Sequence, residues 1–388
     1  MSATLSQVDS CPFTGSSASK SGAAVQPGVV KAAVPVTGYS AVRDVLRTKG
    51  ARQAGFKAEL VDRATSPTRP PILFLTGDAH RRQRAATARF FAPKVVDEKH
   101  RPIMEAAADR LIDVFQRTGA ACLDAMALDM AVTVAAQIVG LTNSEKSGMV
   151  RRLDAFFSAG ASTRTDRLSR VGTMLLAQWR MLQFHWSDVR PAIRARRAVP
   201  GEDVISHLIA DGYRDRDILV ECVTYGAAGM VTTREFITMA GWHLLENDTL
   251  RGAFLSSDRN ARIAFLEEIL RLEPVVGFLY RKMEGEEATL SLDIRSANND
   301  PRAVGPCPME LRPERQRAER VGGAGLAFGD GEHRCPGAGV ALAEAEIFLD
   351  RLLRVPGLKL VRAPEINWNP LVTGYELRGC ELAVERIG

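Results

Sequence analysis

Ten residues near the C-terminal end place one cysteine in a rigid turn before a helix. Residues 328–337 read Phe-Gly-Asp-Gly-Glu-His-Arg-Cys-Pro-Gly, and the Ala-rich run Ala338–Leu353 has the apolar spacing of an amphipathic helix. Glycine lets neighbouring backbone approach closely. Pro336 suits the first turn of a helix, where its missing N–H costs nothing. Unpaired N–H groups and the helix dipole lower the pKa of a cysteine placed there, so Cys335 is predicted to be a thiolate held by a rigid turn.

The residue types alone leave four roles open for this sulfur: a nucleophile, a zinc ligand, a haem ligand or an ordinary buried thiol. A zinc site uses several Cys or His ligands at short spacing, and only His333 lies near Cys335. The segment resembles the haem-binding signature of the cytochromes P450, Phe-Gly-x-Gly-x-His-x-Cys-x-Gly. The resemblance implies that Cys335 is the axial ligand of haem b. The matching positions are Phe328, Gly329, Gly331, His333, Cys335 and Gly337.

Composition limits the class of protein. The chain has 388 residues, of which 46% are apolar and 25% charged, and this excludes disorder throughout. The formal net charge of +5 comes without a Lys/Arg block of the kind found in nucleic-acid-binding arms. No apolar run approaches the roughly 20 residues that span a bilayer. Six scattered cysteines, with no Cys-x-x-Cys pair, indicate neither a disulfide framework nor an iron–sulfur site. We expect a soluble, cytoplasmic, monomeric enzyme that binds neither nucleic acid nor membrane.

Most of the chain has helical periodicity. Residues 1–28, rich in Ser, Ala and Gly, are predicted to be a flexible tail, and residues 29–388 a single domain. Three late segments, Ala288–Ile294, Leu358–Val361 and Cys380–Val384, are predicted strands. The prediction is a mainly α fold with a minor β region. It agrees with the helix-rich fold that the P450 resemblance implies from about residue 35 to the end. The predicted helices cover Met104–Phe115, Ala125–Val139, Val171–Phe184, Asp217–Leu245 and Ala261–Leu272.

Glu268 and Arg271 lie three residues apart, so on one helical face they can pair. Such pairs are common on protein surfaces and contribute only about 0–1 kcal/mol there. The segment also resembles the Glu-x-x-Arg helix of the P450 family, which lies some sixty residues before the haem cysteine. The family completes this network with an arginine from the segment before the cysteine loop. Arg312 is the best match and Arg315 is nearly as good. The resemblance implies a structural role for this trio.

Haem carries two propionates, and buried anions need cationic or hydrogen-bonding partners. His80 and Arg84, four residues apart, resemble the His-x-x-x-Arg pair of the family. Arg281 and His333 resemble its other two propionate contacts. Each of these side chains taken alone could equally be a solvated charge. Together, in the family's order and spacing, they favour a haem site.

The run Ala227–Thr233 lies within the predicted helix Asp217–Leu245. Its small residues Ala228 and Gly229 would let a flat ligand lie against the helix, or would allow a close helix–helix contact. A threonine hydroxyl there either bonds back to the i−4 carbonyl or turns toward a ligand. The run resembles the oxygen-activation motif of the family, Ala/Gly-Gly-x-Asp/Glu-Thr. Thr232 then matches the residue that hydrogen-bonds bound dioxygen.

The chain departs from that motif at Val231, where the family has an acid. Cleaving the O–O bond consumes two protons, and valine cannot relay them. Three interpretations follow: protons come from Glu235, ordered water or substrate hydroxyls; the enzyme uses peroxide; or its chemistry does not cleave dioxygen in the usual way, as in oxidative coupling. We favour the first, with Glu235 as the donor, because Thr232 is retained.

No flavin, dinucleotide or iron–sulfur motif is present, so electrons must come from a separate donor. Arginines flank the first haem-contacting helix and the cysteine loop, and in the family both lie on the cysteine side of the haem. They predict a patch for an acidic ferredoxin, although an arginine-rich chain also scatters arginine everywhere. The arginines are Arg81, Arg82, Arg84 and Arg89, with Arg315, Arg317, Arg320 and Arg334.

Substrate contacts are expected from segments that no motif fixes, and these are mostly apolar. An apolar small molecule of secondary metabolism is therefore expected, with Trp179, Phe184 and Trp186 covering its pocket. The predicted function is a haem-dependent monooxygenase. The alternatives are a P450-fold peroxygenase or coupling enzyme, a non-enzymatic haem-binding sensor, and a helical scaffold without haem. The segments are Phe56–Phe74, Phe156–Phe184, Val220–Thr233, Val275–Leu279 and Leu371–Leu377.

Overall fold

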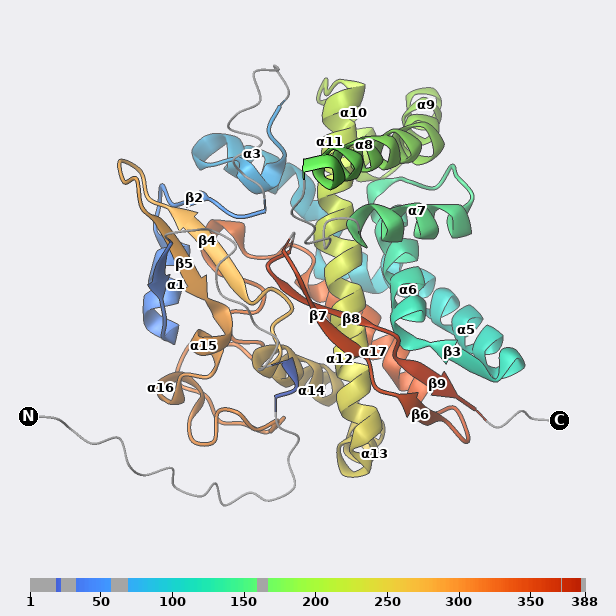
Figure 1. Cartoon of the computed structure of the whole chain (residues 1–388), viewed down its shortest axis with the longest axis vertical. Coiled ribbons are helices and arrows are strands. Elements are labelled where there is room, and N and C mark those ends of the chain that lie inside the picture. The colour runs from blue at the N-terminus through green and yellow to red at the C-terminus, as the bar shows by residue number, and fades with distance from the viewer. Residues whose placement is uncertain (1–18, 22–32, 57–68, 159–166, 371, 385–388) are drawn as a thin grey trace, which may run out of the picture.

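The computed structural model describes residues 19–21, 33–56, 69–158, 167–370 and 372–384. Helices form most of it, and short strands gather in small sheets at the sides (Figure 1). Among the described helices, none is both long and apolar enough to cross a membrane. Cys122, Cys222, Cys335 and Cys380 are free thiols, whereas Cys307 is disulfide-bonded. The predicted mainly α fold with a minor β region is confirmed.

All six predicted helical segments are helical. Ala338–Leu353 has the predicted bounds, and the bounds of the other five differ slightly. The last turn of α6 ends at Gly140, whose positive φ of 98° suits glycine in a helix C-cap. The helices are α1 (Tyr39–Arg47), α3 (Gly77–Ala88), α4 (Pro93–Val95), α5 (Arg101–Thr118), α6 (Leu123–Val139), α7 (Lys146–Ser158), α8 (Arg167–Phe184), α9 (Arg190–Ala198), α10 (Val204–Ala210), α11 (Asp215–Tyr225), α12 (Thr232–Glu246), α13 (Asp248–Ser256), α14 (Arg259–Leu272), α15 (Ile294–Asn298), α16 (Pro301–Val304) and α17 (Ala338–Leu353).

The predicted helix Asp217–Leu245 is two α-helices joined by a π-helical segment, Gly226–Val231. Single π-helical turns inside α-helices often occur at functional sites. This long helical column passes through the middle of the molecule (Figure 1). It therefore presents its irregular turn to the interior.

The strands form three small sheets. The four-stranded sheet has the order β1-β5-β4-β2, the three-stranded sheet β3-β9-β6, and β7 pairs with β8 as a hairpin. The three predicted strands are β5, β6 and β9, and the others were not predicted. The missed strands are short and most pair with distant segments, as β1 does in parallel with β5. The strands are β1 (Val34–Val36), β2 (Arg52–Gln53), β3 (Ala120–Cys122), β4 (Phe278–Lys282), β5 (Thr289–Asp293), β6 (Lys359–Arg362), β7 (Glu365–Asn369), β8 (Gly374–Arg378) and β9 (Glu381–Ala383).

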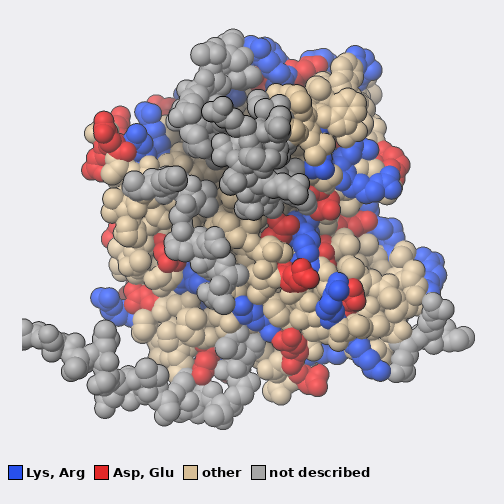
Figure 2. Space-filling view, viewed as in Figure 1, with Lys and Arg blue, Asp and Glu red and all other residues tan. Residues whose placement is uncertain are grey.

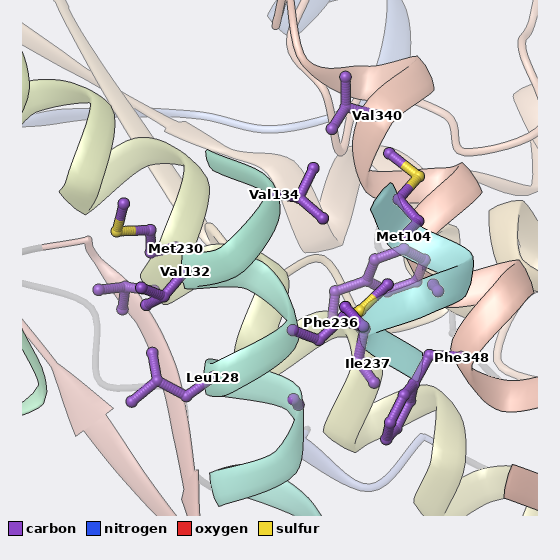
Figure 3. Packing of buried hydrophobic residues seen from close by; sticks show 14 of the residues in the cluster. Met104, Leu128, Val132, Val134, Met230, Phe236, Ile237, Val340 and Phe348 are labelled. Atoms are coloured by element: carbon purple, nitrogen blue, oxygen red, sulfur yellow. The ribbon is translucent and has the colours of Figure 1, made fainter. Parts of the chain in front are cut away.

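The main core lies where α5, α6, α12 and α17 meet. Figure 3 shows Met104 of α5 close to Phe236, Ile237 and Phe348, which come from α12 and α17. Both Met104 and Phe348 are fully buried. The packing holds α17, and with it the segment just before it, firmly against α12.

Part of the predicted N-terminal tail is attached to the core. Ser21 is fully buried and its hydroxyl donates to Glu273, which also accepts from the backbone of Lys20. Lys20 pairs with Glu246 at the end of α12. The other residues of the predicted tail lie outside the described ranges. At residues 19–21, the chain is anchored and not free.

Candidate functional site

A cavity of about 940 Å³ lies between the cysteine loop and the α11–α12 column. The wall of the cavity is mostly apolar. Every residue that the sequence predicted to contact a cofactor lines this wall, together with Thr232. Predictions drawn from four separate stretches of sequence thus meet in one space. The shared residues are His80, Arg84, Ala228, Gly229, Thr232, Arg281, Phe328, Gly329, His333, Cys335 and Gly337.

The cysteine loop is a rigid turn, as predicted. The Cys335 N–H donates to Phe328 O at 2.8 Å, which closes the loop. Gly329 and Gly331 both have a φ of 67°, where a side chain is strained. A Cβ at Gly331 would also lie 2.2 Å from Leu46 O in α1. Both glycines are therefore required by the path of the backbone.

The helix after the loop begins at Ala338, with Gly337 as its N-cap. Pro336 precedes the cap, so it is not in the first turn as predicted. Burial raises the pKa of the Cys335 thiol; the N–H groups of Gly337 and Ala338 and the charge of Arg84 lower it by less. The predicted depression of the pKa is therefore wrong for the protein alone, because the enclosed site disfavours an isolated thiolate. A metal ion bound to the sulfur would reverse this, since a coordinated thiol is deprotonated.

Four basic side chains gather beside the cysteine. The rings of His80 and His333 lie 4.2 Å apart between centroids. Burial, together with the charges of His80, Arg281 and Arg84, lowers the pKa of His333 to about 3. Within the described part of the chain, the His80 Nδ1 is buried without a hydrogen-bond partner. Crowded donors of this kind are suited to binding an anion.

Arg281 is the clearest sign of that anion. It is 3% exposed, and its guanidinium donates to Gln53 Oε1 and to Tyr280 O. Among the described residues no carboxylate pairs with it, and burial lowers its pKa to about 10. A buried guanidinium without an anion is costly. These donors fit a ligand with two carboxylates, as haem has. Gln53 was not predicted as a site residue, and it joins the group through the pairing of β2 with β4.

The π-helical segment forms the facing wall. A Cβ built on Gly229 would meet nothing within 4 Å, so the wall is open there. The Thr232 hydroxyl donates to Ala228 O at 2.6 Å, which is the back-bonding alternative for this threonine. Val231 is 1% exposed and does not line the cavity. A flat ligand can therefore lie against Gly229, with Thr232 at its edge.

Glu235 does not face the cavity, so the prediction that it donates protons there is wrong. Its carboxylate is fully buried and accepts from Arg234 Nε at 2.8 Å, Leu377 N at 2.7 Å and an Arg378 nitrogen at 2.9 Å. Burial raises its pKa, while Arg234 and Arg378 counteract part of that rise. Glu235 ties α12 to the β7–β8 hairpin. The three-residue separation from Thr232 rotates the Glu235 side chain by about 60° around the helix, and the hairpin partners hold it there.

Changing Glu235 to Gln is expected to leave the yield of product per reductant consumed unchanged. It should lower the free energy of unfolding by about 3 kcal/mol, because the buried Arg234 and the half-buried Arg378 each lose one of their two carboxylate partners. Denaturant unfolding and coupled-turnover assays measure these two effects. A fall in the yield without a loss of stability would contradict this assignment.

The predicted ion pair is correct, but its third member is not Arg312. Glu268 and Arg271 are fully buried and joined by two hydrogen bonds of 2.9 Å. Arg315 donates to the same carboxylate at 2.8 Å and Arg317 at 2.9 Å, whereas Arg312 reaches it with its backbone N–H at 3.1 Å. Arg315, the second choice from sequence, takes the place assigned to Arg312.

The substrate segments are partly confirmed. Ile72–Phe74, Val275–Leu279 and Val372 contribute to the cavity wall, as do Ala177, Gln178 and Met181 of α8. Trp179 and Trp186 are 58% and 56% exposed, and Phe184 is 2% exposed. None of these three lines the cavity, so the prediction that they cover it is wrong. Residues 57–68, 159–166 and 371 of the predicted segments lie outside the described residues.

Known proteins support the same reading. No protein-family model matches the chain. Nocardicin C N-oxygenase from Nocardia uniformis subsp. tsuyamanensis is 29% identical over 363 residues, which cover 86% of this chain and 85% of that protein. Cytochrome P450-SOY from Streptomyces griseus is 28% identical, covering 78% and 73%. The crystal structure of ligand-free CYP164A2 from Mycobacterium smegmatis matches with a TM-score of 0.71 and 25% identity over 90% of each chain. With the cysteine loop and its basic cluster in one cavity, the chain resembles the bacterial cytochromes P450 in sequence and in fold.

Proposed function

We propose that this haem-dependent monooxygenase inserts one oxygen atom from O2 into an apolar organic substrate, with electrons from a ferredoxin. The observation that carries the proposal is the junction of Cys335, the basic cluster and Thr232 in one mostly apolar cavity. The relative from Nocardia is named as an N-oxygenase. A coupling enzyme or peroxygenase of the same fold remains the second candidate, because the chain has Val231 where the family has an acid.

The chain's own residues have separable tasks in this reaction. Haem, when bound, supplies dioxygen activation, and thiolate donation favours O–O cleavage. Cys335 would hold the iron, while His80, Arg84, Arg281 and His333 would bind and orient the propionates. Ile72–Phe74 and Val275–Leu279 would exclude water from the substrate. The Thr232 hydroxyl holds a proton at the cavity edge.

The first test is an absorption spectrum of the reduced, carbon monoxide-bound protein, which distinguishes thiolate-bound haem from other haem ligation and from a protein without haem. Turnover is then measured with an electron donor, with peroxide and with neither. Product with the donor supports the monooxygenase, product with peroxide alone supports the second candidate, and no product in either supports the sensor. Ligands that shift the haem spectrum would identify the substrate class.

The proposed ferredoxin surface is smaller than the sequence indicated. Arg315 and Arg317 are committed to Glu268, and Arg84 lines the cavity. Arg81 of α3 lies 3.5 Å from Glu332 in the cysteine loop, and Arg84 donates to Arg334 O. Helix α3 thus lies beside the cysteine loop. Arg320 is also exposed but lies 3.5 Å from Glu319. The exposed members Arg81, Arg82, Arg89 and Arg334 form the proposed docking patch.

Changing Arg82 and Arg89 together to Glu is expected to slow reduction by an acidic ferredoxin by about tenfold at low salt, since charge steering raises association rates by 10 to 10³. Arg302→Glu is the control, because α16 lies at the opposite end of the molecule from α3 in Figure 1. Stopped-flow reduction at several salt concentrations measures the effect. Salt-independent reduction, or equal slowing in the control, would contradict the patch.

A further inference from the structure

Two acids on one face of α11 hold a segment of the cavity wall. Asp217 and Glu221 lie four residues apart, so their side chains project from the same side of the helix. Asp217 Oδ1 accepts from the Arg69 N–H at 3.1 Å, and Glu221 Oε1 accepts from the Ile72 N–H at 3.2 Å. Ile72 begins the 3-10 helical turn Ile72–Phe74, the wall segment, whose three residues all line the cavity. The function described above assigns no role to either acid.

The sequence between the two contacts leaves few backbone donors. Residues 69–72 read Arg-Pro-Pro-Ile. Proline has no N–H, so the two backbone donors that these four residues possess are the two that α11 accepts. The first N–H of a helical turn has no partner inside the turn, and the N-cap Pro71 supplies no side-chain cap. Glu221 therefore caps the wall segment from another helix.

The two contacts differ in character. Asp217 also accepts from Arg214 Nε at 2.7 Å. Burial alone would raise the pKa of Asp217, but Arg214 and the Arg69 N–H outweigh burial and hold it below its ordinary value. Glu221 is 1% exposed, and its Oε2 is buried without a hydrogen-bond partner in the described part of the chain. Burial raises the pKa of Glu221 to about 7, and the Ile72 N–H offsets only part of that rise. Asp217 is therefore ionised at neutral pH, whereas Glu221 changes its charge there.

The titratable neighbours of Glu221 stay neutral. Burial is the main cause of its raised pKa, and among the described residues no charged side chain opposes that rise. Burial also raises the pKa values of Tyr213, Cys222 and Tyr225. Glu221 is thus the group of this contact that changes charge near pH 7. The other ionisable groups around the contact are Arg69, Asp211, Arg214 and Asp217, with Arg84 of α3 near Tyr225 and His185 near Asp215.

We propose that Glu221 is a positioning residue that holds the wall segment closed over the cavity and releases it for ligand entry. Asp217 acts as the hinge, because it keeps Arg69 in place in both states. The proposal rests on the monooxygenase function proposed above, since the wall segment bounds its substrate cavity. When Glu221 is protonated, its carboxyl oxygen accepts from the Ile72 N–H and the buried contact carries no charge. When it is ionised, burial of the charge is costly, and movement of the wall segment lets water reach the carboxylate.

The direction of the pH effect follows from these two states. In the closed state the pKa of Glu221 is about 7, and in an open, hydrated state it returns to the ordinary 4.5. A group with a raised pKa stabilises the closed state fully below about pH 4.5, and this stabilisation is lost as the pH rises through about 7. Opening should therefore become more favourable with rising pH, by about tenfold between pH 6 and pH 8.

Ligand entry is tested with a probe that has no titratable group. n-Butyl isocyanide, which binds reduced haem, is mixed with the reduced, haem-loaded protein by stopped flow between pH 6 and pH 8. The association rate is expected to rise about tenfold in the wild type. In Glu221→Gln, whose amide oxygen still accepts from Ile72, the rate should stay at the low-pH value of the wild type. In Glu221→Ala, which has no acceptor, it should be fast at every pH. Asp215→Asn is the control, because this exposed acid of α11 pairs with Arg197 and not with the wall segment; it should behave as the wild type does.

Hydrogen exchange measures the same opening without a ligand. At a single pH, peptides that contain Ile72–Phe74 should exchange about fivefold faster in Glu221→Ala than in Glu221→Gln, the effect of losing one typical hydrogen bond. Equal exchange in these two variants would overturn the proposal, as would an association rate that does not change with pH in the wild type or that still follows pH in Glu221→Gln. A reduced protein that shows no isocyanide spectrum would instead contradict the proposed haem function, and the exchange comparison would still test the wall segment.

Discussion

Changing Cys335 to Ser is expected to abolish oxygen insertion, with a loss of more than about a thousandfold, equivalent to about 4 kcal/mol of barrier. Serine preserves the size of the side chain, and the loop still closes through the Cys335 N–H on Phe328 O. What disappears is electron donation by sulfur, which favours O–O cleavage. The spectrum of the reduced, carbon monoxide-bound protein and product formation with an electron donor measure the two consequences.

Cys122→Ser is the matched control. Cys122 is a free, half-buried thiol that does not line the cavity. Its variant should keep both the spectrum and the activity of the wild type. If Cys335→Ser retained the thiolate spectrum, the iron would have to be bound by another cysteine, and the assignment of the cavity as the haem site would be wrong.

The largest loss of stability is expected from Glu268→Gln. Three arginine side chains donate to this carboxylate, and Arg271 and Arg315 are nearly inaccessible to solvent. Removing one partner of a buried ion pair leaves uncompensated charge, and the cost is about 3–5 kcal/mol. Denaturant unfolding of the haem-loaded protein measures it. Glu267→Gln, at the neighbouring half-buried position, is the control and should lose far less.

The same carboxylate makes stability depend on pH. Burial raises the pKa of Glu268, but hydrogen bonds and charge from Arg271 and Arg315 outweigh burial, so the pKa lies below its ordinary 4.5. A group with a lowered folded-state pKa stabilises the protein above its unfolded-state pKa. This contribution should be complete above about pH 4.5 and disappear as the pH falls through the folded-state value. An equal acid-induced loss of stability in Glu268→Gln would contradict it.

Local sequence patterns predicted the helices well because helical periodicity depends on residues that are close together in the sequence. Ala338–Leu353 was predicted with the bounds that α17 has, and its periodicity arises from neighbours three and four residues apart. The strands β7 and β8 were missed, although they pair in register from Glu365 with Arg378 to Asn369 with Gly374. Short alternating segments carry little signal when burial depends on distant partners.

The site residues likewise divide into those that a local motif predicts and those whose position depends on distant partners. The motif positions around Cys335 were predictable because each serves the local turn or the ligand. Choosing between Arg312 and Arg315 required knowing which of the two side chains points toward Glu268. The path of the backbone decides this, and the spacing of residues along the sequence does not reveal it. Glu235 was assigned to the cavity from its distance to Thr232 along the chain. The partners that hold it, Leu377 and Arg378, come from 142 and 143 residues away.

The π-helical turn at Gly226–Val231 has a consequence for how this chain tolerates insertions and deletions. A π turn holds one residue more than an α turn, so the faces of α11 and α12 differ in phase by about 100°, the rotation per residue in a helix of 3.6 residues per turn. On α11, Glu221 accepts from the Ile72 backbone at the rim of the cavity. Deleting one small residue, such as Ala227, would regularise the helix yet rotate Glu221 away from that rim. The irregular turn thus sets the angular alignment between the wall that carries Thr232 and the segment Ile72–Phe74 of the same cavity wall.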